Sequence, residues 1–263
     1  ACLRARMPEG DSVFRAARAL HAGLAGHEIV RFDLRVPRAA TADLRGETVH
    51  EVVPRGKHLL MRVGDYTLHS HLRMEGRWDV YARGGAWKRP AFQARAIVGT
   101  SQTDAVGFDL AMVELVPTST ESDLVGHLGP DPLSRKWDPA EAARRLAADP
   151  RPIHVALLDQ RNVAGFGNEY ANELLFIRGV LPTHPATDVD TAALLETGAR
   201  MIRANLTPGP RVFTGDSRPG QRTWVYRRER KACRRCGTLI QTGELGADPT
   251  EERNTFWCPR CQH

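Results

Sequence analysis

The chain has few cysteines, few lysines and no long apolar run. No segment of its 263 residues approaches the eighteen or more consecutive apolar residues that a membrane-spanning helix needs. Residues 1–6 also lack the apolar core of a signal peptide, so we expect a cytoplasmic protein with no membrane partner. Lysine occurs only at positions 57, 88, 136 and 231, which makes an isolated lysine such as Lys57 conspicuous.

The composition is that of a folded protein with a polyanionic partner. Hydrophobic residues make up 41% of the chain, far above the content of a disordered sequence. The length is sufficient for two domains with their own cores and a small metal-stabilised segment. A formal charge of +6 favours nucleic acid as a partner, although charge alone indicates only non-specific binding.

The first half of the chain has the pattern of one helix followed by many short strands. Val13, Ala17 and Leu20 recur at helical spacing, which predicts a helix over 12–24 with a polar residue at 11 or 12 as its N-cap. From residue 28 to about residue 115 the apolar runs shorten to strand length, which favours an antiparallel sandwich or barrel. The clearest of these segments are 29–36, 48–53, 58–63, 66–72 and 95–98.

A turn-rich motif separates this half from a helical one. The sequence His-Leu-Gly-Pro-Asp-Pro-Leu at 127–133 predicts a domain boundary. Beyond it we expect one helix from Pro139, capped by Asp138, and another over 153–160, with a loop over 207–221. The predicted divisions are an N-terminal extension over 1–6, a β-sandwich domain over 7–130, a helical domain over 131–225 and a metal-binding finger over 226–263.

Two C-x-x-C pairs near the C-terminus predict a metal site. Cys233 pairs with Cys236 in this spacing, and Cys258 pairs with Cys261. Two such turns aim four thiolates at one ion, which is typical of a single structural zinc ion, Zn2+. Folding this end of the chain is the simplest role for the metal. The hairpin between the pairs ends at Arg253, a residue type that binds phosphate through two parallel hydrogen bonds.

A second pattern predicts an anion-binding helix start. Gly165 and Gly167 allow close approach of a backbone, and Asn168 begins a segment with helical spacing that ends at Gly179. The N–H groups and the positive dipole end of such a helix point at an anion, and the Asn168 amide adds a donor.

These segments together resemble one family. Asp-Gln at 159–160, followed by Val-Ala-Gly-Phe-Gly-Asn-Glu-Tyr at 163–170, is similar to the helix-two-turn-helix signature of the formamidopyrimidine-DNA glycosylase and endonuclease VIII family. The cysteine-rich end, Leu-Gly-Pro at 128–130 and Met-Pro-Glu-Gly at 7–10 also resemble that family. The resemblance implies an α+β multidomain fold, with an N-terminal antiparallel β-sandwich and initial helix, a C-terminal helical helix-two-turn-helix domain and a zinc finger.

The resemblance also implies catalytic roles for individual residues. Pro8 would be the nucleophile once methionine is removed, because a free proline is a secondary amine that attacks a sugar carbon and forms an iminium. By the same resemblance Glu9 transfers protons, and Lys57 contacts phosphate and assists elimination. Arg253 would bind the phosphate of the lesion and take part in a second elimination.

The DNA contacts expected from the resemblance include Gly167, Asn168 and Met74. The segment 69–76 resembles the loop that fills the gap left by an extruded base, with Met74 as the wedge. The alternative is that Met74 packs in the core and that His69 and His71 are strand residues with ordinary hydrogen-bond partners.

The implied activity is that of a DNA glycosylase and abasic-site lyase. Its partner would be DNA carrying oxidised bases or abasic sites, bound by a monomer in a bacterial cytoplasm. Segment 105–110 lacks the Arg and Phe pair that the purine-specific branch uses to read the opposite strand. The sequence therefore favours the endonuclease VIII branch and oxidised pyrimidines.

Residues 1–6 conflict with the implied chemistry. The nitrogen of an internal proline is an amide with a delocalised lone pair, so the chain as written is expected to show little covalent trapping through Pro8. One hypothesis is that 1–6 reflect an over-long start or a cleaved segment. A second is a catalytically silent protein that binds damaged or single-stranded DNA. A third is a zinc-ribbon regulator or RNA-associated protein, which leaves the N-terminal motif unexplained. The intact set of Glu9, Lys57, Asn168 and Arg253 favours the first hypothesis.

Overall fold

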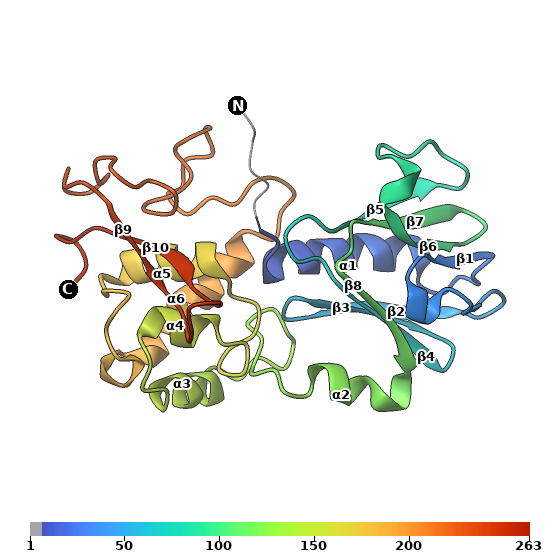
Figure 1. Cartoon of the computed structure of the whole chain (residues 1–263), viewed down its shortest axis with the longest axis horizontal. Coiled ribbons are helices and arrows are strands. Elements are labelled where there is room, and N and C mark those ends of the chain that lie inside the picture. Colours follow the sequence, from blue (N-terminus) through green and yellow to red (C-terminus); the bar gives the residue numbers. More distant parts are fainter. Residues whose placement is uncertain (1–6) are drawn as a thin grey trace. The chain divides into compact units, whose positions relative to one another are not determined.

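The computed structural model describes residues 7–263, so the predicted extension over 1–6 lies outside the described residues. The chain forms two compact units, one ending at His127 and the other spanning Leu128–His263. Figure 1 shows the ribbon of each unit. Each unit has its own hydrophobic core.

The first unit is a sandwich of two four-stranded antiparallel sheets, with strand order β1-β6-β7-β5 in sheet I and β2-β3-β4-β8 in sheet II. The strands of sheet I are β1 (Arg31–Leu34), β5 (Arg77–Ala82), β6 (Ala94–Gly99) and β7 (Thr103–Phe108). The strands of sheet II are β2 (Val49–Arg55), β3 (His58–Val63), β4 (Tyr66–His71) and β8 (Met112–Pro117).

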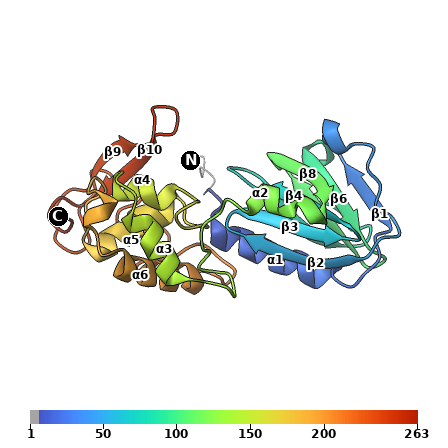
Figure 2. The ribbon, with the colours of Figure 1, turned by 90° about the horizontal axis from the view of Figure 1, so that it is seen from below.

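Helix α1 (Gly10–Leu24) closes one side of the sandwich. It lies against β2 and β5, which are edge strands of the two sheets, and Figures 1 and 2 show it running along β2. Val13, Ala17 and Leu20 on its buried face pack into the same core as Leu59 and Met61 of β3. The core thus joins residues at helical spacing with residues at the alternating spacing of strands, as the sequence pattern predicts.

A long connection between β5 and β6 covers the outer face of sheet I. Ile97, Val106 and Phe108 form an apolar cluster there, and Trp87 packs edge-on against Phe108 with ring centroids 5.8 Å apart. The unit is completed by the short helices η1 (Pro37–Ala39), η2 (Ala91–Gln93), η3 (Thr118–Thr120) and α2 (Glu121–Val125).

The second unit begins with helices whose ends carry the caps that the sequence predicts. The Asp138 side chain accepts the N–H of Glu141 at 3.0 Å, and Gly179 ends its helix with φ +72°. Asp190 caps a further helix that the sequence analysis did not single out. The helices are α3 (Pro139–Ala147), α4 (Ile153–Leu158), α5 (Asn168–Arg178), η4 (Ala186–Asp188) and α6 (Thr191–Ala204).

The Leu-Gly-Pro motif packs directly on the turn that precedes α5. The N–H of Gly129 donates to the carbonyl oxygen of Gln160 at 2.8 Å, and the N–H of Ala164 donates to that of Pro130 at 2.9 Å. A Cβ at Gly129 would lie 2.4 Å from the carbonyl oxygen of Arg161. Glycine is therefore required here because two backbone segments approach closely.

The C-terminal end is a two-stranded hairpin beside a cysteine cluster. Strand β9 (Gln241–Leu245) pairs antiparallel with β10 (Arg253–Trp257). Phe176 of α5 shares a small core with Tyr226, Ile240 and Phe256, so the finger packs on α5 (Figure 2).

The predicted order of an initial helix, a β-sandwich, a helical region and a cysteine-containing end is confirmed. Among residues 7–263, no helix is both long and apolar enough to cross a bilayer.

Candidate functional site

Pro8 and Glu9 lie at the start of α1. Glu9 is the N-cap residue, and its carbonyl oxygen accepts the N–H groups of Ser12 at 2.9 Å and Val13 at 3.2 Å. Glu9 is buried, whereas Pro8 is half-buried. The positive end of the helix dipole favours a carboxylate at this position. Both residues are therefore fixed at the end of a rigid element.

Lys57 lies in the tight turn between β2 and β3 and is half-buried. Gly56, which precedes it, has φ +58°, a conformation that glycine adopts at little cost. The turn holds Lys57 at one end of sheet II, beside the paired strand positions of His58 and His71.

Four histidines gather at this end of sheet II. His58 Nδ1 lies 2.8 Å from His69 Nε2, and the two rings are stacked. The ring of His71 meets that of His58 edge-on at 5.1 Å, and the ring of His127 does so at 6.4 Å. We refer to these four residues as the histidine cluster. The strand register that brings His58 and His71 opposite each other is the feature that sequence reasoning missed.

The partners of the cluster fix its protons. Glu114 Oε2 lies 3.2 Å from His69 Nδ1, so His69 donates there and offers the lone pair of Nε2 to His58. Burial, followed by the neighbouring histidines and Lys57, lowers the pKa of His58 to about 3. Burial, followed by the charges of Lys57 and Arg73, lowers the pKa of His71 to about 4. These imidazoles are therefore neutral near physiological pH.

His69 and His71 of β4 have ordinary hydrogen-bond partners, as the alternative interpretation of segment 69–76 predicted. His69 bonds to Glu114, and His71 Nδ1 accepts the N–H of Arg73 at 3.0 Å. Met74, in contrast, is 51% exposed in the loop that follows β4, so it does not pack in the core. Arg73 has φ +48°, a strained conformation for a non-glycine residue. The loop therefore presents Met74 outward, and its wedge role stays a prediction.

Gln160 holds the turn that leads into α5. Its Oε1 accepts the N–H of Gly165 at 2.9 Å, while its Nε2 donates to the carbonyl oxygens of Leu158 at 2.8 Å and Phe166 at 3.0 Å. Gly165 has φ +98°, and Gly167 is the N-cap residue of α5. The turn places the positive end of the α5 dipole at the predicted anion site.

Asn168 joins α5 to the hairpin. Its Oδ1 lies 2.8 Å from His154 Nε2, and its Nδ2 donates to the carbonyl oxygen of Asn254 in β10 at 2.9 Å. The side chain is nearly buried, with the residue 7% exposed. The sequence analysis expected this amide to face an anion, and the internal bond to β10 is a role it did not foresee. A DNA contact by Asn168 stays a prediction.

Arg253 is exposed at the first position of β10, opposite Leu245. Its Nη1 donates to the carbonyl oxygen of Glu252 at 2.8 Å, and within residues 7–263 no carboxylate forms an ion pair with it. Its guanidinium is therefore available to an external anion.

The four cysteine sulfurs lie within 4.8 Å of one another. Cys236 Sγ and Cys258 Sγ are 3.4 Å apart, and Cys233 Sγ and Cys261 Sγ are 3.9 Å apart. A tetrahedral ion with metal–sulfur bonds of about 2.3 Å needs sulfur separations of about 3.8 Å. The four thiols therefore fit one metal ion with no open coordination position.

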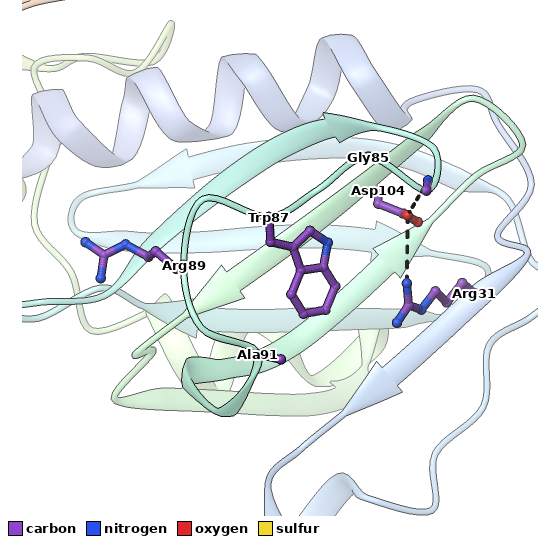
Figure 3. A pocket seen from close by; sticks show the side chains of 7 residues that line it. Arg31, Gly85, Trp87, Arg89, Ala91 and Asp104 are labelled. Atoms are coloured by element: carbon purple, nitrogen blue, oxygen red, sulfur yellow. Dashed lines mark hydrogen bonds and ion pairs between the residues drawn. The ribbon is translucent and has the colours of Figure 1, made fainter.

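A hollow of about 340 Å³ on the outer face of sheet I is a separate feature (Figure 3). The side chains of Arg31 and Arg89 lie on either side of Trp87 there. Asp104 lies 3.8 Å from Arg31, and Asp109 lies 3.3 Å from Arg89. Because both guanidinium groups already have carboxylate partners, the hollow is a poor phosphate site.

The predicted residues fall into two groups, one in each unit. Pro8, Glu9, Lys57 and Met74 belong to the first unit. Gly167, Asn168, Arg253 and the four cysteines belong to the second, where Asn168 bonds to the strand that carries Arg253.

Two family profiles match most of the chain. The N-terminal domain of formamidopyrimidine-DNA glycosylase matches residues 7–128, and the H2TH domain of the same enzyme matches residues 128–206.

Named relatives and solved structures are similar over nearly the whole chain. The chain is 50% identical to a probable endonuclease 8 2 of Streptomyces coelicolor, over 97% of this chain and 94% of the relative. It is 48% identical to the DNA-(apurinic or apyrimidinic site) lyase Nei2 of Mycolicibacterium smegmatis, over 97% and 99% of the two chains. MutM in complex with DNA containing carbocyclic 8-oxo-G has a TM-score of 0.79 at 26% identity, covering 97% of this chain and 100% of that chain. The Lactococcus lactis Fpg bound to DNA containing an oxidised pyrimidine has a TM-score of 0.80 at 25% identity, with the same coverage.

The histidine cluster predicts a pH-dependent stability. Below about pH 6.5 an unfolded His58 binds a proton that the folded ring takes up only near pH 3, so stability falls as pH falls through this window. We expect His58→Gln to make this dependence shallower by up to about 1.4 kcal/mol per pH unit. Denaturant unfolding between pH 4 and pH 7 measures it, with exposed His50→Gln in β2 as the control. Identical slopes for His58→Gln and the parent would contradict a half-buried His58 that stays neutral in the folded protein.

Proposed function

Because the chain belongs to the formamidopyrimidine-DNA glycosylase and endonuclease VIII family, we propose that it is a DNA glycosylase that also cleaves DNA at abasic sites. The observation that carries the proposal is near 50% identity, over 97% of the chain, to relatives named endonuclease 8 and abasic-site lyase. Its substrate would be damaged DNA, bound by a monomer.

The proposed reaction begins at Pro8. As the free N-terminal residue, its neutral secondary amine attacks C1′ of the damaged nucleoside, the bond from C1′ to the base breaks, and the base leaves with a proton. The amine then loses its proton, the C1′–O4′ bond breaks and O4′ takes up a proton. This opens the sugar ring and leaves an iminium between Pro8 and C1′. Loss of a proton from C2′ then expels the 3′ phosphate by elimination, and water hydrolyses the iminium. Glu9, at the start of the same helix, is the proposed proton-transfer residue.

Lys57 and Arg253 are the proposed phosphate ligands of the reaction. Lys57 is held by the β2–β3 turn beside His58 and His71, whose lowered pKa values keep them neutral, so neither competes with Lys57 for a phosphate. Arg253 presents an exposed guanidinium on β10, and it would assist the second elimination. Gly167 and Asn168 would add phosphate contacts at the start of α5.

The metal at the cysteine cluster is proposed to be zinc with a structural role. Cys233, Cys236, Cys258 and Cys261 would hold it as four thiolates, the donor set that zinc takes in closed structural sites. The ion would stabilise the finger and so fix the hairpin that carries Arg253.

The proposed substrates are oxidised pyrimidines and abasic sites. Segment 105–110 carries no Arg and Phe pair of the kind used by the purine-specific branch. Phe108 ends β7 fully buried against Trp87, so its ring is not available to enter DNA. Met74, exposed in the loop after β4, is then the proposed wedge.

We expect a protein whose first residue is Pro8 to form a covalent adduct with an oligonucleotide containing an abasic site when borohydride is present. A protein in which Met7 acylates Pro8 should give little adduct, because the amide nitrogen is not nucleophilic. Mass spectrometry of the trapped peptide identifies the attacking residue.

An adduct mapped to Lys57 or to another amine would show that the nucleophile is wrongly assigned. Absence of activity on every oxidised-base and abasic substrate, with DNA binding retained, would favour a protein that only recognises damage.

Zinc removal should weaken DNA binding sharply while the β-sandwich stays folded, because the finger has too small a core to fold without its metal. Affinity is measured before and after metal ejection, with circular dichroism and metal analysis on the same samples. Restored binding after zinc is returned is the control, and unchanged affinity after verified metal loss would contradict the prediction.

Arg253→Ala and Asn168→Ala should each weaken binding to lesion-containing duplex, and Arg253→Ala should also flatten its salt dependence. Loss of the Arg253 contact lowers the slope of log K against log salt by about 0.9, because a neutralised phosphate releases its counterions, whereas the uncharged Asn168 amide leaves the slope unchanged. The matched control is Arg144→Ala, an exposed arginine on α3 that pairs with Glu141. A slope equal to that of the parent would exclude Arg253 as a phosphate ligand, and an affinity equal to that of the parent would exclude Asn168.

A further inference from the structure

His154 in α4 is fully buried, yet one of its ring nitrogens is unused. Its Nδ1 has no hydrogen-bond partner among the described residues, while its Nε2 lies 2.8 Å from Asn168 Oδ1. An unpartnered polar atom in a protein interior reduces stability, so an apolar side chain would be the more stable occupant. The imidazole therefore needs a reason beyond packing. Its shortest hydrogen bond among the described residues joins Nε2 to Asn168, while Asn172 Nδ2 lies farther from Nε2, at 3.4 Å.

The neighbouring groups determine which nitrogen of His154 carries the hydrogen. The carbonyl oxygen of Asn254 only accepts, so the Asn168 amide must turn its nitrogen toward β10. Its oxygen then faces His154 and must accept, which requires N–H at Nε2. A second proton at Nδ1 would be buried without an acceptor, and burial lowers the pKa of His154 to about 4. The ring is a neutral donor aimed at one oxygen.

The same oxygen connects to a second asparagine of α5. Asn172 Nδ2 donates to Asn168 Oδ1 at 3.0 Å and to the Asn168 carbonyl oxygen at 2.8 Å. Its own Oδ1 accepts the N–H of Phe256 at 2.6 Å. Asn254 and Phe256 are two residues apart in β10, so the two asparagines bind the edge of that strand that faces away from β9.

We propose that His154 is a positioning residue for DNA binding, which fixes the Asn168 amide so that α5 and the Arg253 strand form one rigid phosphate-binding unit. The proposal rests on the proposed DNA function. Without the Nε2 donor the Asn168 oxygen keeps only the longer bond from Asn172, so the amide that binds β10 next to Arg253 is held less firmly. His154 itself touches neither DNA nor the reacting atoms in this scheme.

Three substitutions of His154 distinguish the effect of losing the hydrogen-bond donor from the effect of changing the side-chain volume. His154→Gln places an amide nitrogen close to where Nε2 lies, His154→Asn places one close to Nδ1, and His154→Leu supplies no donor. With a duplex containing a tetrahydrofuran abasic-site analogue, we expect the Leu and Asn variants to raise Kd roughly tenfold, as for one buried hydrogen bond. The Gln variant should stay within about twofold of the parent.

A double-mutant cycle distinguishes positioning from general stabilisation. In an Asn168→Ala background His154→Leu should have no further effect on Kd, because its partner oxygen is gone. Additive effects, or a Gln variant as weak as the Leu variant, would overturn the proposal. If His154→Leu fails to fold, the comparison of Gln with Asn decides the question.

Amide hydrogen exchange of Phe256 in the protein without DNA tests the network separately from DNA repair. Exchange should be faster in His154→Leu than in the parent, and near the parent rate in His154→Gln. If the parent neither binds nor cleaves abasic DNA while exchange responds in this way, the proposed function fails and the positioning role of His154 within the network stands. Equal exchange in parent, Leu and Gln proteins would overturn the positioning role whatever the DNA assays give.

Discussion

The buried polar side chains of helix α5 are the constraint on which the second unit depends. Glu173 accepts the backbone N–H groups of residues 224–226 at 2.7 to 2.9 Å. Glu169 pairs with Arg211 at 2.9 Å, and both side chains are almost fully buried. The asparagines at the first and fifth positions of the helix hold β10. Removing one member of such a set leaves its partner buried and unpaired, which costs far more than an exposed contact is worth.

The hydrogen bonds from α5 bind segments of the second unit that have few apolar residues of their own, among them the hairpin of β9 and β10. A two-stranded hairpin is at best marginally stable alone, and the finger shares its few apolar residues with Phe176 of α5. A metal ion would fix the two cysteine turns, but it does not fix the hairpin against the helix. Asn168 and Asn172 hold the hairpin against the helix, so the first turns of α5 determine the position of the strand that carries Arg253.

Local signals in the sequence were sufficient for much of this arrangement. Some features depend only on contacts between residues close in sequence, so they are predictable without tertiary contacts. These are the helix caps at Asp138 and Gly179 and the turns of the C-x-x-C pairs. The histidine cluster depends on which strand positions lie opposite each other, and one shift in register would separate it. The amide of Asn168 faced the same difficulty, because its partner Asn254 is 86 residues away. The local sequence does not indicate whether the Asn168 amide donates to an external anion or to the carbonyl oxygen of Asn254.

Each unit has a proposed functional site at the N-terminus of a helix, α1 in the first unit and α5 in the second, and the neighbouring groups differ between the two. At α5 the first side chain is bonded to neighbouring protein groups, and the positive dipole end is the proposed anion site. At α1 the residue before the N-cap is Pro8, and the N-cap is the buried Glu9. A positive dipole end disfavours the ammonium form of a free Pro8 amine relative to the neutral form. A carboxylate at Glu9 acts in the opposite sense, since it attracts a proton to its neighbourhood. In the proposed reaction this opposition is useful, because the amine must be neutral to attack, and an adjacent group must then accept and return protons at the sugar.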